Sequence, residues 1–317
     1  MQSPVMTIVQ RSPLRYRISR SLNLFLVKSL KVPRLSAIRI ARYLNIAASP
    51  LAQLQRRRTA AAIIRARRAS PNKIVISRRD GYAFVAPNAL PEIGPAVAEA
   101  AEVYATAAEK HALEFRTRRA SKKEFMQYAS QGGETSRCRD IMKLALSRAL
   151  IDAVTEYLGE LPVIGNASIM VSVPNDSQVA SQLYHLDFAD EKQVKLFVYV
   201  DAVTLDNGPF TFTPVPVTEE LLKTYNYDRG RLSIEQVQEA VGPEREIQVT
   251  GSAGTALLCD TSRCLHYGSN RNKSTRVVIL IQYVSHAVPE QPPVVWPVEE
   301  LARDLKLDPI QKMTLTL

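Results

Sequence analysis

The second half of the chain consists of short runs of strand-forming residues. Val, Ile, Phe, Tyr and Thr are concentrated in six segments, 168–173, 194–203, 210–213, 246–249, 255–259 and 276–284. Gly, Pro, Asn and Asp mark turns between these segments, and no helical pattern separates each pair of them. This spacing predicts a β-sandwich or β-barrel and is not typical of a parallel α/β sheet.

The first half of the chain has a helical pattern. It predicts one helix over 96–115 and a second over 136–158, with Gly159 placed to end the second helix. Short strands are predicted at 74–76 and 82–85. Helices followed by a long series of strands indicate the α+β class.

Charge divides the chain into a basic N-terminal arm and an acidic body. Residues 1–79 contain 18 Lys or Arg and no acidic residue, and the first acid is Asp80. Residues 80–317 hold the other 23 of the 41 basic residues and all 31 acidic ones, which gives a net charge near −8. We therefore expect an arm over 1–79 and a domain over 80–317, with a helical part at 90–160 and a β core at 165–290.

The arm combines its cations with apolar residues in a rough two-faced helical pattern over 22–44, interrupted at Pro33. Several interpretations stay open. Residues 1–70 could lie on an anionic membrane surface, pack on the body with their Arg side chains facing its carboxylates, or act as an organelle transit segment. Binding to nucleic acid is disfavoured, because few aromatic residues are interleaved with the charges.

The cysteine count and hydropathy narrow the range of cellular compartments in which the protein is expected. The chain has three cysteines, no C-x-x-C motif and no apolar run that approaches the ~20 residues of a membrane span. These features favour a reducing compartment. The expected location is the cytoplasm, with contact to a membrane surface through the arm. A mitochondrion or another organelle is the alternative if the arm is a transit segment.

The stretch L-Y-H-L-D-F at 183–188 carries the first candidate chemistry. In an extended chain, His185 and Asp187 point to the same side because side chains alternate with a period of two. A neutral imidazole and a carboxylate directed to one spot indicate a metal site or a proton-transfer site.

A third ligand lies about eighty residues further on. His266 follows the 255–259 run and precedes the run that begins at Arg276. Two His and one carboxylate on one side of an iron ion leave positions open for substrates, as in non-haem Fe(II) oxygenases. Arg276 could bind a carboxylate bidentately inside a barrel, which suits 2-oxoglutarate as a cosubstrate.

Four motifs together resemble a known family. They are Q-L-Y-H-L-D-F at 182–188, N-G-P-F-T-F-T-P at 207–214, G-S-A-G-T-A-L-L-C-D-T-S-R-C-L-H-Y-G-S-N at 251–270 and R-V-V-I-L-I-Q-Y at 276–283. Their order and spacing resemble the phytanoyl-CoA dioxygenase-like branch of the Fe(II)/2-oxoglutarate oxygenases over about 165–285. The resemblance implies a double-stranded β-helix, of the jelly-roll or cupin-like kind, with supporting helices. It also implies iron on His185, Asp187 and His266, and 2-oxoglutarate on Arg276.

The resemblance extends to further site residues and to the reaction. In that family a hydroxyl residue after the distal His helps to hold the carboxylate, and here Ser269 stands three residues after His266. Gln182 and Tyr184 precede the H-x-D pair and are expected to line the pocket. The implied activity is a dioxygenase that uses O2, converts 2-oxoglutarate to succinate and CO2, and hydroxylates an unidentified small-molecule or lipid-linked substrate.

Two other functions stay open. The chain could be a non-catalytic β-helix binding protein tethered by its basic arm. It could also be a cupin-like metal enzyme that does not use 2-oxoglutarate. The segment 205–250 is a candidate lid, and the sequence names neither the substrate nor the oligomeric state.

Overall fold

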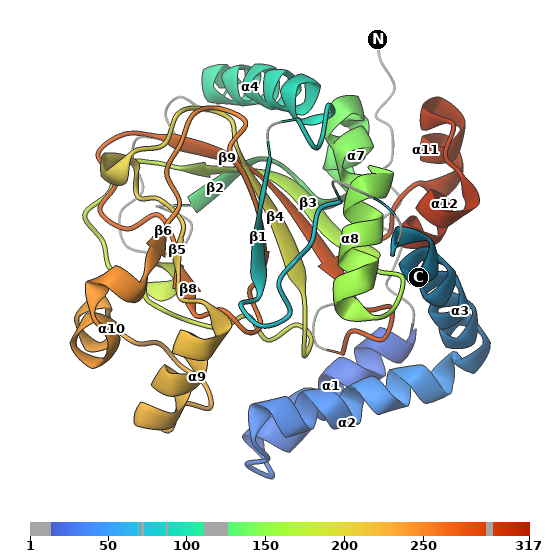
Figure 1. Cartoon of the computed structure of the whole chain (residues 1–317), viewed down its shortest axis with the longest axis horizontal. Coiled ribbons are helices and arrows are strands. Elements are labelled where there is room, and N and C mark those ends of the chain that lie inside the picture. The colour runs from blue at the N-terminus through green and yellow to red at the C-terminus, as the bar shows by residue number, and fades with distance from the viewer. Residues whose placement is uncertain (1–13, 69, 71–72, 87, 111–125, 290–293) are drawn as a thin grey trace.

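The computed structural model describes residues 14–68, 70, 73–86, 88–110, 126–289 and 294–317 (Figure 1). It combines helices with two antiparallel sheets. The helices are α1 (Leu14–Lys28), α2 (Arg34–Ala48), α3 (Pro50–Arg67), α4 (Ile93–Lys110), α7 (Arg139–Ala145), α8 (Arg148–Leu158), α9 (Val215–Thr224), α10 (Ile234–Val241), α11 (Val298–Leu305) and α12 (Pro309–Leu315). Short 3-10 helices are η1 (Gly132–Arg137), η2 (Ala180–Gln182), η3 (Leu205–Asn207) and η4 (Pro243–Arg245).

The larger sheet has six strands and the smaller sheet has three. In spatial order the larger sheet contains β1 (Tyr82–Val85), β7 (Ala256–Asp260), β4 (Val194–Tyr199), β9 (Arg276–Val284), β3 (Val163–Ser172) and β2 (Met126–Gln131). The smaller sheet contains β6 (Ile247–Gln248), β5 (Thr211–Phe212) and β8 (His266–Tyr267). All pairings between these strands are antiparallel, so the predicted α+β class is confirmed.

The central strands of the large sheet are buried on both faces. On β4, Val194, Leu196 and Val198 pack with the apolar side chains of α4, α7 and α8. Phe197 and Tyr199 point to the other face, where they pack with residues of the smaller sheet. One face of the sheet therefore forms the main core, and the other is available for a site between the two sheets.

Several predicted elements differ from the observed ones. The predicted helix at 136–158 is divided into η1, α7 and α8, with a non-helical backbone at Ser147. The division follows from packing, because α7 packs against α4 whereas α8 packs against α3. Gly159 ends α8 in the left-handed conformation, as predicted.

Smaller differences occur at other elements. The segment 74–76 forms no strand, although Ile74 and Ile76 are buried and Val75 between them is exposed. Strand β2 was not predicted. The predicted helix 96–115 corresponds to α4, and residues 111–115 lie outside the described part of the chain. The strand prediction at 276–284 matches β9 in both bounds.

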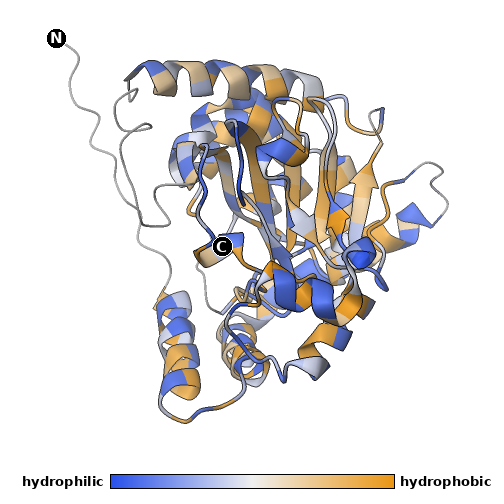
Figure 2. Ribbon diagram, turned by 90° about the vertical axis from the view of Figure 1, so that its left-hand side faces the viewer, coloured by the Kyte–Doolittle hydropathy of each residue, from blue (hydrophilic) through white to orange (hydrophobic). Residues whose placement is uncertain are grey.

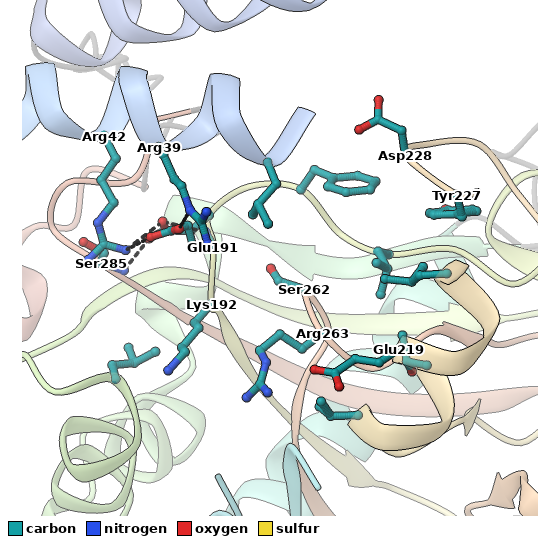
Figure 3. Close-up of a pocket in the computed structure, with 18 of the residues that line it drawn as sticks. Arg39, Arg42, Glu191, Lys192, Glu219, Tyr227, Asp228, Ser262, Arg263 and Ser285 are labelled. Atoms are coloured by element: carbon teal, nitrogen blue, oxygen red, sulfur yellow. Dashed lines mark hydrogen bonds and ion pairs between the residues drawn. The ribbon is translucent and has the colours of Figure 1, made fainter. Parts of the chain in front are cut away.

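The described part of the arm forms three helices. The chain turns between α1 and α2 around Pro33, as predicted, and α1 and α2 pack on each other. Arg42 on α2 donates to Glu160 (2.7 Å) and to Asp190 (3.1 Å), and Arg39 pairs with Glu191 (Figure 3). This is the arrangement expected from helices that pack on the body with their Arg side chains facing its carboxylates. No described helix is both long enough and apolar enough to cross a bilayer.

Arg56 on α3 joins the arm to two distant parts of the body. Its guanidinium donates to the carbonyls of Leu161 and Pro162 (both 3.2 Å), and to those of Met313 (2.5 Å) and Thr316 (2.6 Å). Burial lowers the pKa of Arg56 to about 10, so the side chain stays charged at neutral pH. One cation thus satisfies carbonyls before β3 and at the end of α12.

Replacing Arg56 by Met should lower the free energy of unfolding by about 3 kcal/mol, because four backbone carbonyls lose a charged donor. The matched control is Arg57→Met on the exposed face of the same helix, which should change stability by less than about 0.5 kcal/mol. Urea unfolding followed by circular dichroism measures both. Equal losses for the two variants would contradict the role given to Arg56.

His286 lies in the same interface and is 2% exposed. Its ring nitrogens contact the side chains of Arg15 (2.6 Å) and Gln53 (3.0 Å). Burial, with Arg56 and Arg15 nearby, lowers the pKa of His286 from 6.5 to about 3. The imidazole is therefore neutral in the folded protein.

Acid should weaken the folded state through His286. Its pKa is lower in the folded than in the unfolded chain, so the unfolded chain takes up the proton first, and stability is lost as the pH falls from 6.5 towards 3. The variant His286→Gln lacks this group and should lose up to about 1.4 kcal/mol less per pH unit in that window. Urea unfolding at pH 7.5, 6, 5 and 4 tests this, and parallel curves for the two proteins would refute it.

Candidate metal centre

Two backbone hydrogen bonds bring the two candidate histidines together. His185 and His266 form an antiparallel bridge in which each N–H donates to the other's carbonyl at 3.0 Å. The N–H of Asp187 donates to the carbonyl of Thr261 (2.9 Å), which ties the segment to the 261–266 loop at a second point. Opposed residues of an antiparallel pair project to the same side, and here the two imidazole centroids lie 4.4 Å apart.

The ligand atoms of three residues converge. One atom each from His185, Asp187 and His266 lie within 4.8 Å of one another, and His266 Nε2 is 3.6 Å from Asp187 Oδ2. The Nδ1 atoms of the two histidines contact the carbonyls of Leu183 and Cys264, each at 2.9 Å. A carbonyl only accepts, so we assign the hydrogen to Nδ1, which leaves each Nε2 lone pair free for a metal.

Burial sets the protonation of this group. It lowers the pKa of His266 to about 3, with the neighbouring His185 adding to the effect, and it also lowers the pKa of His185. Burial alone would raise the pKa of Asp187, but Lys195 and the two histidines hold that pKa well below its usual range. Two neutral imidazoles and one carboxylate are the forms in which these side chains bind a divalent ion.

The three ligands open into a cavity of about 150 Å³ between the two sheets. Alternating side chains of β4 and β9 form one wall, because residues two apart face the same side of a strand. The apolar residues of the cavity include Met170, Phe197, Phe210, Val278 and Leu280. Its polar groups include Lys195, Ser269 and Arg276 in addition to the three ligands.

Arg276 is a buried cation at the first position of β9. Its side chain is 3% exposed, and among the described residues no carboxylate forms an ion pair with it. Its Nη1 donates to the carbonyl of Gly208 and Nη2 approaches Ser172 Oγ (3.4 Å), but Nε is buried without a partner. A Cβ atom at residue 268 would lie 3.4 Å from Nη2, so the backbone of Gly268 passes close to the guanidinium.

The structure brings Ser269 into the same cavity. Its backbone has φ 63°, and its Oγ is buried with no hydrogen-bond partner among the described residues. Gln182 supports it from outside, because Gln182 Nε2 donates to the Ser269 carbonyl (2.7 Å). Tyr184 instead packs edge-on against Tyr267, with ring centroids 4.7 Å apart. Neither Gln182 nor Tyr184 belongs to the described residues that line the cavity.

The sequence reasoning missed Lys195. Its Nζ donates to Asp187 Oδ2 at 2.6 Å, the carboxylate oxygen that also faces His266. Lys195 is the one charged residue within β4, V-K-L-F-V-Y. A single lysine in an otherwise apolar strand was the sequence feature that could have indicated a site residue. A metal ion on Oδ2 would compete with this ammonium for the same oxygen.

A second cavity lies on the other side of the segment 185–188, which carries two of the three candidate ligands and is called the metal-binding segment. Leu186 and Phe188 alternate with the two ligands and line a space of about 530 Å³ between α2 and α9. In Figure 3, Arg39 and Arg42 extend from α2 towards Glu191, and Lys192 and Arg263 lie farther from the helix. The segment 185–188 thus separates two cavities.

The residues fit an Fe(II) site of the 2-His-1-carboxylate type. The donor set is two neutral imidazoles and one carboxylate, and the cavity adds polar atoms, Ser269 Oγ and Arg276 Nε, that have no protein partner among the described residues. Such a donor set leaves coordination positions open for other ligands.

No protein-family model and no curated protein sequence matches the chain. Solved structures similar to it include the non-haem α-ketoglutarate-dependent epimerase SnoN from nogalamycin biosynthesis, at 17% identity, covering 72% of this chain and 83% of that chain with a TM-score of 0.43. Another is EctD from S. alaskensis with bound Fe, at 18% identity, covering 68% and 79% with a TM-score of 0.46. A third is the non-haem monooxygenase ThoJ with nickel, at 16% identity, covering 66% and 75% with a TM-score of 0.42.

These neighbours include non-haem iron and α-ketoglutarate-dependent enzymes, the class that the four sequence motifs resemble. With identities below 20% and TM-scores below 0.5, the function of this chain has to be argued from its own residues.

Removal of one candidate ligand should strongly weaken metal binding. His185→Ala and Asp187→Ala should each weaken Co(II) binding by more than about 100-fold, because an open site with two ligands holds a divalent ion poorly. Titration followed by the visible absorption of Co(II) measures this. His286→Gln is the matched control, since it changes another buried imidazole outside the site. Full binding by Asp187→Ala would contradict the assignment.

Proposed function

We propose that the protein is an Fe(II)- and 2-oxoglutarate-dependent dioxygenase that hydroxylates an organic substrate. The observation that carries the proposal is the buried guanidinium of Arg276, which forms no ion pair with a carboxylate of the described residues and lies in the cavity that also holds His185, Asp187 and His266. A cation buried without a counter-ion is costly, so the cavity favours an anionic ligand. A dicarboxylate that can bind a metal at one end and a guanidinium at the other meets both requirements.

In this proposal the two facing sheets are the halves of a double-stranded β-helix. The metal ligands come from β8 and from the segment that pairs with it, whereas Arg276 comes from the larger sheet. The distance between an iron and the guanidinium is then set by the separation of the sheets. The separation of the sheets would therefore select a cosubstrate of matching length that carries an acid group at the end farther from the metal.

When bound, Fe(II) would supply the oxidation: one atom of O2 enters the substrate C–H bond to give C–OH, the other enters succinate, and 2-oxoglutarate loses CO2. The protein residues would position the reactants. His185, Asp187 and His266 hold the metal, Arg276 binds the distal carboxylate, and Ser269 Oγ donates to it. The apolar side chains of the cavity exclude water from the reacting groups.

The substrate should present an apolar C–H group to the cavity. Met126 and Tyr128 on β2, with Met170 and Leu280, line the cavity and offer few hydrogen bonds to a polar substrate. Helices α9 and α10 belong to the predicted 205–250 lid and pack around Tyr184, Leu186 and Tyr267 beside the site. A small or lipid-linked molecule with an apolar reacting end fits this environment.

Anaerobic addition of Fe(II) and 2-oxoglutarate tests the proposal without the substrate. The wild-type protein should give a weak visible charge-transfer band, and Arg276→Met should need at least tenfold more 2-oxoglutarate for half of that band. Arg276→Lys should lie between them, because it keeps the charge and loses the bidentate geometry.

A second measurement separates a binding role from a structural one. Arg276→Met removes a buried charge, so the ligand-free variant should be at least as stable as the wild type. A large loss of stability with unchanged 2-oxoglutarate dependence would refute the role of Arg276.

Absence of the band in the wild type would favour a non-catalytic binding protein, or a metal enzyme that does not use 2-oxoglutarate. If the band forms, oxygen-dependent succinate formation stimulated by metabolite or glycolipid pools would identify the substrate class.

A further inference from the structure

Helix α1 has one buried face and one exposed face on which no other described element packs. Tyr16, Ser19 and Asn23 are buried, as are Leu26 and Val27, and they face α2 and the 286–289 segment. On the opposite face is a shallow depression whose described lining residues all belong to α1 and follow helical spacing: Leu14, Arg17, Ile18, Ser21, Leu22 and Phe25. In Figure 2, α1 forms the lower left edge of the molecule, where it follows the grey N-terminal trace.

This outer face is unusually apolar for a surface helix. Leu14 is 65% exposed, Ile18 is 54% exposed and Phe25 is 52% exposed. Three large apolar side chains on one exposed stripe indicate an interaction site, since single exposed apolar residues are common but aligned ones are not. Exposed apolar residues continue on the neighbouring helices, at Ile40, Tyr43, Leu51 and Leu54.

The cations around this face lack acidic partners. Arg17, Arg20, Lys28 and Lys31 are exposed, and none of them occurs in an ion pair with another described residue. In contrast, Arg39, Arg42 and Arg67 of the arm form ion pairs with carboxylates of the body. The first 79 residues contain no acid at all, so every charged side chain on the outer side of the arm is positive.

We propose that α1 docks on the surface of an anionic lipid bilayer. Leu14, Ile18 and Phe25 would enter the boundary between headgroups and acyl chains, and the neighbouring cations would bind lipid phosphates. The helix has 15 residues and is about 22 Å long, which is too short to cross the bilayer core. It would therefore lie in the plane of the surface.

Charge and apolar character together select this partner. Nucleic acid would match the cations but would leave the apolar stripe in water. A second copy of the chain would match the stripe but would bring the same positive charges against it. An anionic bilayer satisfies both features at once, and the inference does not depend on the proposed enzymatic activity.

Vesicle flotation of the full-length protein tests the charge requirement. Binding is expected to vesicles with phosphatidylglycerol and not to pure phosphatidylcholine. Arg17→Glu/Arg20→Glu should weaken it at least tenfold, because each basic residue near the surface contributes about 1 kcal/mol. The matched control is Lys223→Glu/Lys306→Glu, the same charge change at exposed positions of the body, which should bind like the wild type. Equal weakening by both variants would overturn the proposal.

Fluorescence tests whether the apolar stripe enters the bilayer. The chain has one tryptophan, Trp296, which is buried and donates to the Ile164 carbonyl, so its emission should not change. In a Phe25→Trp variant, anionic vesicles should shift the emission to shorter wavelength. Binding without this shift would overturn insertion of the face, and binding to duplex DNA or RNA without vesicle binding would replace the bilayer by nucleic acid.

Discussion

The bridge between His185 and His266 is the constraint on which the rest of the site depends. Two reciprocal hydrogen bonds of 3.0 Å join segments that are about eighty residues apart and hold both imidazoles on one side. The carbonyls of Leu183 and Cys264, each two residues before a histidine, then fix the ring orientation. The backbone therefore prepares the metal ligands before any ion binds, and the side chains need little reorganisation.

The alternation of side chains along an extended chain decides which residues face the candidate site and which face the core or the second cavity. On β4 it turns Lys195 towards the cavity while Leu196 enters the main core. In the metal-binding segment it turns His185 and Asp187 to one cavity and Leu186 and Phe188 to the other. A shift of register by one residue would exchange the two sets, so the site and the core specify the same pairing.

The sequence predicted the features that depend on short-range pattern. The three ligands and Arg276 stand beside strand runs, and the structure brings all four to one cavity. It did not predict the break at Ser147, because that break follows from α7 and α8 packing on different helices and carries no Gly or Pro signal. The positions of Gln182 and Tyr184 depend on which loop and helix lie beside them, and only tertiary structure determines this.

The contact of α2 with the body has a consequence for the integrity of the protein. Asp190 is buried three residues after Asp187, and Arg42 provides its positive neighbour although burial still raises the Asp190 pKa to about 6. Loss of the arm by proteolysis would leave Asp190 and Glu160 without this counter-ion and would open the wall behind the metal-binding segment. The arm is therefore part of the wall around the candidate metal site, and its docking on a surface would fix the orientation of the whole molecule.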